Sequence, residues 1–299
     1  MWPTCHGENA ANIITQAGIN MFIAEIGINH NGDIDLAKKL INMAKKAGAD
    51  VVKFQKRDVD TCVPANMKNV IKHTPWGDMK YIEYKRKLEF SKNEYSVIDA
   101  YCKTVGIKWA ASVWDIQSLE FITSYNVPFI KIPSACITDI ELVKKTSRIN
   151  KPVIISTGMS TFPEIRRCVR LLSKCDLTIL HCNSSYPADE HELDLNVIGM
   201  FKKLFTGHKI GYSGHENGIY ASIVAKALGA EVIERHITLD KKMWGTDQAA
   251  SLDYDELSRL ICVLEKIPIW LGKNHVHIYD SELLAKEKLR RKFSISPTP

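Results

Sequence analysis

Two histidines stand where short apolar segments end, and their positions suit a metal ion. His215 follows residues 209–211, and His236 follows residues 231–234. Residues 21 positions apart cannot share one helix face, but the ends of two neighbouring parallel strands would bring them together. Two neutral imidazoles with room for water and a substrate suit a divalent metal that acts as a Lewis acid. The spacing therefore predicts a metal site at the mouth of a barrel.

Lysines and serines follow other apolar segments in the same way. This set consists of Lys53, Ser112, Lys131, Ser134, Ser156, Ser184 and Ser213. Taken singly, such a lysine is more often a solvated rim residue, and such a serine more often caps the next helix. Together, two ammonium groups supply charge while hydroxyls and loop amides supply directional hydrogen bonds. The whole set therefore predicts a site for a phosphorylated anion.

An alternation of strands and helices must position these residues. Eight short apolar segments separated by helical patterns are found at residues 21–26, 51–54, 107–111, 128–131, 152–155, 177–180, 209–211 and 231–234. Such alternation indicates a parallel sheet, and eight units that close on themselves form a TIM (β/α)8 barrel. An open doubly wound sheet is the competing arrangement, but no GxGxxG follows the first strand. Residues 58–78 are predicted to be a long loop that serves as a lid or a subunit contact.

Composition excludes several classes of function. The net charge of +6 arises partly from a basic run at residues 286–292, which no aromatic residue interrupts, so we predict a solvated helix face and no nucleic-acid partner. Eight cysteines without CxxC spacing suit reduced thiols in a cytoplasm better than a disulfide framework. Neither a signal peptide nor an apolar run long enough for a membrane span is predicted.

Six blocks in order resemble signatures of the N-acetylneuraminate (sialic acid) synthase family. They lie at residues 22–32, 52–55, 155–159, 181–187, 211–215 and 234–238, and together they are highly specific. The resemblance implies a transferase on a single barrel. That enzyme condenses phosphoenolpyruvate with an open-chain N-acyl amino sugar and releases phosphate and a sialic or other nonulosonic acid.

The resemblance also implies roles for individual residues. Phosphoenolpyruvate would contact Lys53, Ser112, Lys131, Ser134, Ser156, Ser184 and Ser213. The sugar would contact Glu25, Gln55, Tyr186 and Asp247, and His215 and His236 would bind Mn²⁺ or Mg²⁺. Glu25 and Glu234 are both candidates for the proton carrier, and the sequence does not choose between them.

Three departures from the family pattern concern the sugar. Cys136 stands where an acidic, sugar-facing residue is common, and Trp114 is larger than its usual counterpart. The third departure is the expected lack of the family's C-terminal antifreeze-like domain. We expect residues 1–20 to be a lead-in or hairpin, residues 21–280 to form the barrel and residues 281–299 to be a basic tail. The departures predict a changed acceptor or a pocket that residues 58–78 and 241–247 complete. A homodimer through barrel faces is a further expectation.

Three alternatives remain at this stage. The first is a synthase that uses phosphoenolpyruvate with a different aldose, giving an octulosonate-, heptulosonate- or KDN-like product. The second is a barrel that only binds sugar, which the presence of Lys53, Lys131, His215 and His236 disfavours. The third is a Schiff-base aldolase that would use one desolvated lysine and no paired histidines.

Overall fold

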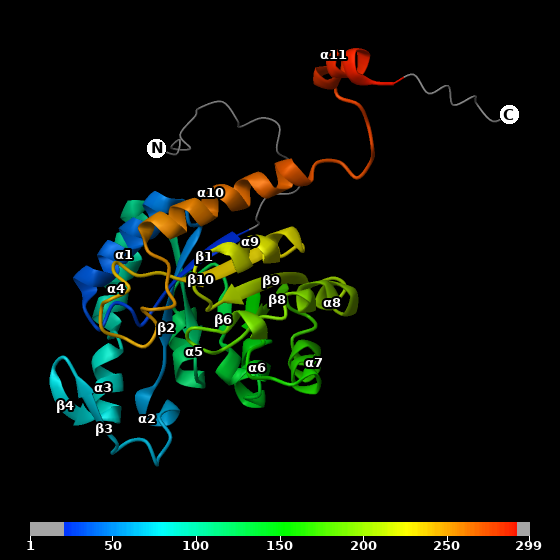
Figure 1. The fold of residues 1–299 in the computed structure, drawn as a ribbon. Helices are drawn as coiled ribbons and strands as arrows, with labels where there is room; N and C mark the ends of the chain where they lie inside the picture. The colour runs from blue at the N-terminus through cyan, green and yellow to red at the C-terminus, as the bar shows by residue number, and fades with distance from the viewer. Residues whose placement is uncertain (1–20, 292–299) are drawn as a thin grey trace.

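The computed structural model describes residues 21–291, which contain a closed barrel of eight parallel strands (Figure 1). Around the barrel the strands follow the order β1, β2, β5, β6, β7, β8, β9 and β10, and β10 pairs with β1. Their bounds are Met21–Gly27 (β1), Val51–Lys56 (β2), Lys108–Val113 (β5), Ile130–Ile132 (β6), Val153–Ser156 (β7), Leu177–Cys182 (β8), Lys209–Gly214 (β9) and Val232–His236 (β10). The predicted (β/α)8 barrel is confirmed, and every predicted strand overlaps an observed one.

Helices follow the barrel strands and cover them on the outside (Figure 1). Apart from two helices in the segment directly after β2, the helices between successive barrel strands are Ile34–Ala47 (α1), Lys92–Val105 (α4), Ile116–Thr123 (α5), Ile140–Thr146 (α6), Phe162–Leu171 (α7), Asn196–Leu204 (α8) and Tyr220–Ala227 (α9), and Tyr254–Leu271 (α10) follows β10. Local sequence explains the ends of α1. The Asp33 carboxylate accepts hydrogen bonds from the backbone amides of Asp35 and Leu36, and Gly48 ends the helix in the left-handed conformation.

The segment after β2 differs from the predicted long loop. It contains a short helix, Val59–Cys62 (α2), and an antiparallel hairpin of Ile71–Thr74 (β3) and Gly77–Lys80 (β4) that leads into Tyr81–Leu88 (α3). The sequence does not reveal this hairpin because both strands are only four residues long and mostly exposed, so they lack an alternating apolar pattern.

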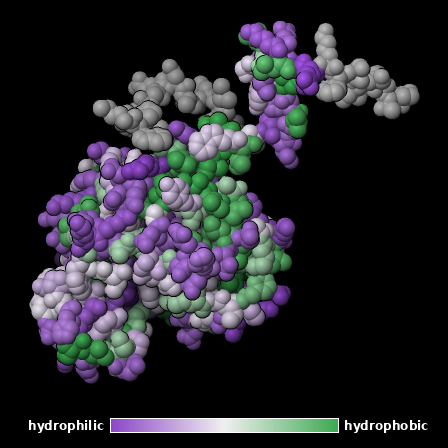
Figure 2. Space-filling view, viewed as in Figure 1, coloured by the Kyte–Doolittle hydropathy of each residue, from purple (hydrophilic) through white to green (hydrophobic). Residues whose placement is uncertain are grey.

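The outer surface carries an apolar patch over α9 and the end of α10, which is green in Figure 2. Its exposed side chains include Tyr220, Val224, Ile269 and Trp270. Beyond α10, Asp280–Leu289 (α11) is exposed along its whole length. The expected lead-in at residues 1–20 and the last eight residues of the expected tail lie outside the described residues. Within residues 21–291, no helix has both the length and the apolar character needed to cross a membrane.

Candidate active site

The barrel interior is built from two layers that follow the twofold periodicity of the strands. The lower layer is apolar and consists of Ile23, Val51, Ala110, Phe129, Ile154, Leu180 and Val232. Two residues further along the same strands are Glu25, Lys53, Ser112, Lys131, Ser156, Cys182 and Glu234, all of which line one cavity. Side chains two positions apart point to the same face of a strand, so the apolar layer supports a polar layer at the carboxyl ends.

This cavity encloses about 270 Å³ at the mouth of the barrel. The lining of the cavity contains every predicted site residue except Asp247. These residues are Glu25, Lys53, Gln55, Ser112, Lys131, Ser134, Ser156, Ser184, Tyr186, Ser213, His215, Glu234 and His236. Trp114, Pro133, Ala135, Met159 and Cys182 complete the lining. The predicted residues therefore share one site although the chain brings them from all eight strands.

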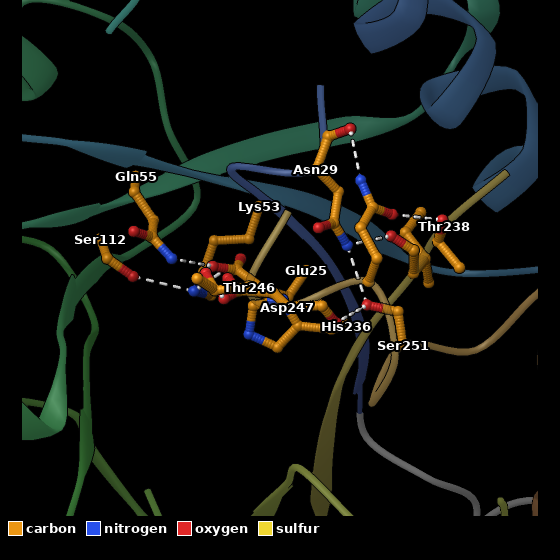
Figure 3. Close-up of polar contacts among 12 residues, drawn as sticks. Glu25, Asn29, Lys53, Gln55, Ser112, His236, Thr238, Thr246, Asp247 and Ser251 are labelled. Carbon is orange, nitrogen blue, oxygen red and sulfur yellow. Dashed lines mark hydrogen bonds and ion pairs between the residues drawn. The ribbon is translucent and has the colours of Figure 1, made fainter. Parts of the chain in front are cut away.

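Two buried lysines dominate the charge of the cavity. Lys53 Nζ lies 2.7 Å from Glu25 Oε2 and donates to Ser112 Oγ at 2.8 Å (Figure 3). Lys131 Nζ donates to Ser156 Oγ at 2.6 Å. Both ammonium groups also face the same oxygen, Glu234 Oε1, at 3.6 and 3.5 Å. Glu234 faces both cations, whereas Glu25 pairs with Lys53 only, so the site retains positive charge whenever Glu25 is protonated, and an anionic ligand can then neutralise that charge.

The two carboxyl groups of the cavity have opposite protonation behaviour. Burial raises the pKa of Glu25 to about 7, while Lys53 opposes this rise and Glu234 adds to it. Burial also disfavours the charge of Glu234, but Lys131 and Lys53 outweigh burial and lower the pKa of Glu234 to about 2. At neutral pH, Glu234 is therefore ionised whereas Glu25 can exchange a proton.

The two predicted metal ligands lie side by side, with imidazole centroids 5.4 Å apart. His215 Nδ1 donates to the carbonyl oxygen of Asn183, which leaves Nε2 of His215 available. His236 Nδ1 is buried without a hydrogen-bond partner among residues 21–291, and it lies 3.8 Å from Asp247 Oδ2. Burial and the nearby His215 and Lys53 lower the pKa of His236, so its ring is neutral.

These observations fit a divalent metal that binds two imidazoles and completes its coordination with water and substrate. Nδ1 of His236 has no hydrogen-bond partner among the described residues, so in the tautomer protonated at Nε2 its electron pair would be free to bind a metal. No cluster of three or more histidine, cysteine, aspartate or glutamate ligands is present in the described part of the chain. A metal held by the two imidazoles would therefore take its remaining ligands from water and substrate.

Asp247 does not line the cavity, but a hydrogen-bond network holds its loop beside His236 (Figure 3). Asn29 Nδ2, from the loop after β1, donates to Ile237 O at 2.9 Å and to Ser251 Oγ at 2.8 Å. Ser251 Oγ donates in turn to the backbone oxygen of Asp247 at 2.7 Å. The loop after β10 is therefore anchored to the loop after β1, a contact that the sequence did not reveal.

Gly158 brings two of the predicted serines close to the backbone after β7. Its amide donates to Ser134 Oγ at 3.0 Å. A Cβ atom at this position would lie only 2.1 Å from Ser184 Oγ and 3.0 Å from Ser134 Oγ. The close approach of the two serines favours glycine here, whereas the backbone conformation at this position is one that other residues adopt easily.

Two cysteines lie close to the site. Cys136 is buried, its thiol lies 3.5 Å from the backbone oxygen of Trp114, and it is not among the residues that line the cavity. Cys182 does line the cavity, with Sγ 3.8 Å from His215 Nδ1. Its position two residues after Leu180 is the signal that could have identified it.

Comparisons with known proteins support one relationship. The sequence pattern of the NeuB family matches residues 40–276. N-acetylneuraminate-9-phosphate synthase from Homo sapiens is 40% identical over 274 residues, which cover 89% of this chain and 75% of the human protein. N,N'-diacetyllegionaminic acid synthase from Campylobacter jejuni is 35% identical over 289 residues, covering 91% of this chain and 86% of that protein.

A solved structure has the same architecture. The crystal structure of N-acetylneuraminic acid (sialic acid) synthetase from Leptospira borgpetersenii, in complex with citrate, superposes with a TM-score of 0.81 at 30% identity. The match covers 95% of this chain and 97% of that one. The family resemblance predicted from the six sequence blocks is confirmed.

Proposed function

This chain belongs to the NeuB family, and we propose that it condenses phosphoenolpyruvate with an open-chain N-acyl amino sugar related to N-acetylmannosamine. The products would be a sialic or other nonulosonic acid and phosphate. The similar human and Campylobacter proteins are named as synthases of acids of this kind. The observation that carries the proposal is the pair of buried ammonium groups, Lys53 and Lys131, which both face the carboxylate of Glu234, while Glu25 pairs with Lys53 alone.

Phosphoenolpyruvate would neutralise the charge of these two lysines. Its phosphate and carboxylate require several donors, and Ser112 and Ser156 already lie within hydrogen-bond distance of the ammonium groups. C3 of phosphoenolpyruvate would attack the aldehyde carbon, water would add at C2, and the C2–O bond would break to release phosphate. Lys53 and Lys131, preorganised in a buried site, would stabilise the charge that moves onto the leaving phosphate.

Glu25 is the better candidate for the proton carrier. Glu234 Oε1 faces Lys53, Lys131 and Ser213, whose hydroxyl lies at 3.1 Å, so this carboxylate is held ionised as a partner of the lysines. Glu25 faces one cation and accepts from Gln55 Nε2 at 3.2 Å. Its pKa near 7 further supports this role, because the group can accept the proton of the attacking water at neutral pH.

His215 and His236 would hold Mn²⁺ or Mg²⁺, which supplies Lewis-acid polarisation of the aldehyde oxygen when bound. Tyr186 lies against both rings, with centroid distances of 4.1 Å to His215 and 5.7 Å to His236. Together with Gln55 and Asp247, Tyr186 would orient the sugar in front of the histidines.

The test combines turnover with direct metal binding. Phosphate release from phosphoenolpyruvate should require an aldose and a divalent metal, and EDTA should abolish it. In calorimetric titrations with Mn²⁺, His236→Ala should weaken binding by at least tenfold. The control His208→Ala, outside the cavity lining, should leave Mn²⁺ binding unchanged. Equal Mn²⁺ affinity in wild type and His236→Ala would refute the metal site, and covalent trapping with borohydride would favour the Schiff-base alternative.

A further inference from the structure

Arg235 is the largest fully buried side chain in residues 21–291, and it lies between two residues of the site. It follows Glu234 and precedes His236 on β10, and its exposed fraction is 0%. Because side chains alternate along a strand, Glu234 and His236 point into the cavity whereas Arg235 points outward, toward the layer of helices. A guanidinium buried in that layer is costly unless it is paired and hydrogen-bonded.

The guanidinium of Arg235 is held by the loop that follows β9 and by the start of α9. Its Nη1 donates to Glu216 Oε1 at 2.7 Å, to Gly218 O at 2.9 Å and to Ser222 Oγ at 2.9 Å. Its Nη2 donates to the backbone oxygen of Glu216 at 2.6 Å. The other carboxylate oxygen of Glu216, Oε2, accepts from the Tyr212 hydroxyl at 2.7 Å. One side chain of β10 therefore fixes the loop after β9 by its charge and by several hydrogen bonds.

These contacts begin where the sheet stops joining the two strands. The backbone pairing of β9 with β10 ends at Gly214 and Arg235 (Figure 1). The next residue on each side is a histidine of the site, His215 in one case and His236 in the other. His236 still pairs with β1, whereas His215 lies beyond the end of β9. The contacts of Arg235 therefore provide the connection between the two histidines that the backbone ladder no longer provides.

The packing around this ion pair is tight. A Cβ atom at Gly214 would lie 2.5 Å from Glu216 Oε2 and 3.0 Å from Arg235 Cδ. On the side of β8, the backbone oxygen of His215 accepts from the amide of Ala188 at 3.0 Å. His215 is thus held from two neighbouring strands, and a change in the ion pair would release one of these two supports.

We propose that the buried ion pair of Arg235 and Glu216 positions the metal site. The pair sets the separation of the His215 and His236 imidazoles, whose centroids lie 5.4 Å apart. This inference rests on the proposed function, because it takes the two histidines as ligands of a divalent metal. Neither residue of the pair lines the cavity, so both act through the backbone of the histidine next to them. A metal with two protein ligands is sensitive to their separation, since no third side chain compensates when one of them moves.

A purely structural role makes a different prediction. A buried ion pair often adds little to the free energy of unfolding compared with apolar residues of similar volume, so stability alone does not account for this one. If the pair only stabilised the barrel, its loss would leave the Mn²⁺ affinity of the folded protein unchanged. If the pair positions the histidines, Mn²⁺ affinity falls although the protein remains folded. The Mn²⁺ affinity of the folded protein therefore distinguishes the two roles.

The experiment measures Mn²⁺ binding to the full chain by titration calorimetry, with circular dichroism to verify that each variant is folded. Arg235→Lys keeps the charge but loses the planar fork, and Glu216→Gln keeps the shape but loses the charge. Each should raise the Kd of Mn²⁺ about tenfold or more, the size typical of changes to groups that orient metal ligands. Tyr212→Phe, which removes the hydrogen bond to Glu216 Oε2, should raise it less. The affinity for phosphoenolpyruvate in EDTA, which depends on Lys53 and Lys131, should stay close to that of wild type.

Leu264→Ala is the matched control, because it removes buried packing on α10, lowers stability and lies outside the cavity lining. Its Kd for Mn²⁺ should equal that of wild type. Wild-type Mn²⁺ affinity in Arg235→Lys and Glu216→Gln, or an equal loss in Leu264→Ala, would overturn the proposal. If these two variants do not fold, the milder Tyr212→Phe decides the matter, and wild-type affinity in it overturns the proposal. Equal affinity in wild type and His236→Ala would instead contradict the proposed metal site itself, so the two failures are distinguishable.

Discussion

Replacing Gly158 by alanine would displace a predicted phosphoenolpyruvate contact while leaving its chemistry in place. The new Cβ would lie 2.1 Å from Ser184 Oγ, so the hydroxyl would have to move by about 1.3 Å to reach the 3.4 Å of an ordinary contact. Ser184 is only partly buried, and rotation of its side chain can make this movement. We therefore expect a loss of ligand binding with little change in the free energy of unfolding.

The size of the loss follows from one hydrogen bond to a charged ligand. Such a bond is worth about 1.5–3 kcal/mol, which corresponds to a rise of about 10- to 100-fold in the Kd or KM of phosphoenolpyruvate. The assays are calorimetric titration with phosphoenolpyruvate and initial-rate measurements of phosphate release. Chemical unfolding of the same variant should show a loss of less than about 1 kcal/mol.

Two further variants make this prediction specific. Ser184→Ala removes the hydroxyl that the new Cβ would approach most closely, so in that background Gly158→Ala should act mainly through Ser134 Oγ, 3.0 Å from the new Cβ, and the two effects should be less than additive. Gly199→Ala, inside α8 with nothing within 4 Å of the new Cβ, should leave phosphoenolpyruvate binding unchanged and stabilise the protein slightly. Wild-type affinity for phosphoenolpyruvate in Gly158→Ala would refute the assignment of Ser184.

Two predictions concern buried charge. In the folded protein the pKa of Glu25 is raised from 4.5 to about 7, so folding favours the protonated form of this group. Its contribution to the free energy of unfolding, ~3 kcal/mol, is therefore fully present below pH 4.5 and is lost as the pH rises through 7. The free energy of unfolding, measured in urea with EDTA between pH 4.5 and 8, should therefore fall more steeply with pH in wild type than in Glu25→Gln. The same pH dependence in both proteins would contradict this prediction. Arg235 and Glu216 form a fully buried ion pair at 2.7 Å, and Glu216→Gln should lower the free energy of unfolding by about 3–5 kcal/mol because it leaves a buried cation unpaired. If the free energy of unfolding fell by less than 1 kcal/mol, the other oxygens around Arg235 would be sufficient to stabilise its charge without the carboxylate.

The inner part of the site could be predicted from sequence because it depends on local regularities. Each strand is a short apolar segment, and the residue that enters the cavity is found two positions after a buried one, as in Val51 and Lys53 or Phe129 and Lys131. The barrel then brings these positions to one end whatever their separation along the chain. Cys182 follows the same period two residues after Leu180, so the strand periodicity also predicts that its thiol enters the cavity.

The outer part could not be predicted because it depends on contacts between distant loops. The network behind Asp247 joins Asn29 to Ser251, 222 positions away. Tyr84 of α3 packs edge-on against Trp244, in the loop after β10, with ring centroids 5.3 Å apart. No periodic pattern specifies where such loops meet, and the hairpin strands are too short and exposed to be recognised. Residues 58–78 and 241–247 were predicted to complete the pocket, but their partners in α3 were not identified.

The central claim is that phosphoenolpyruvate and an aldose are joined at this cavity, and product mass tests it most directly. The purified protein would be incubated with phosphoenolpyruvate, Mn²⁺ and a panel of N-acylated and plain aldoses, with and without a terminal phosphate. For at least one N-acyl amino sugar, we expect a product whose mass equals phosphoenolpyruvate plus aldose plus water minus phosphoric acid, formed in step with phosphate release. Absence of such a product across the whole panel, under conditions in which phosphoenolpyruvate binds, would contradict it.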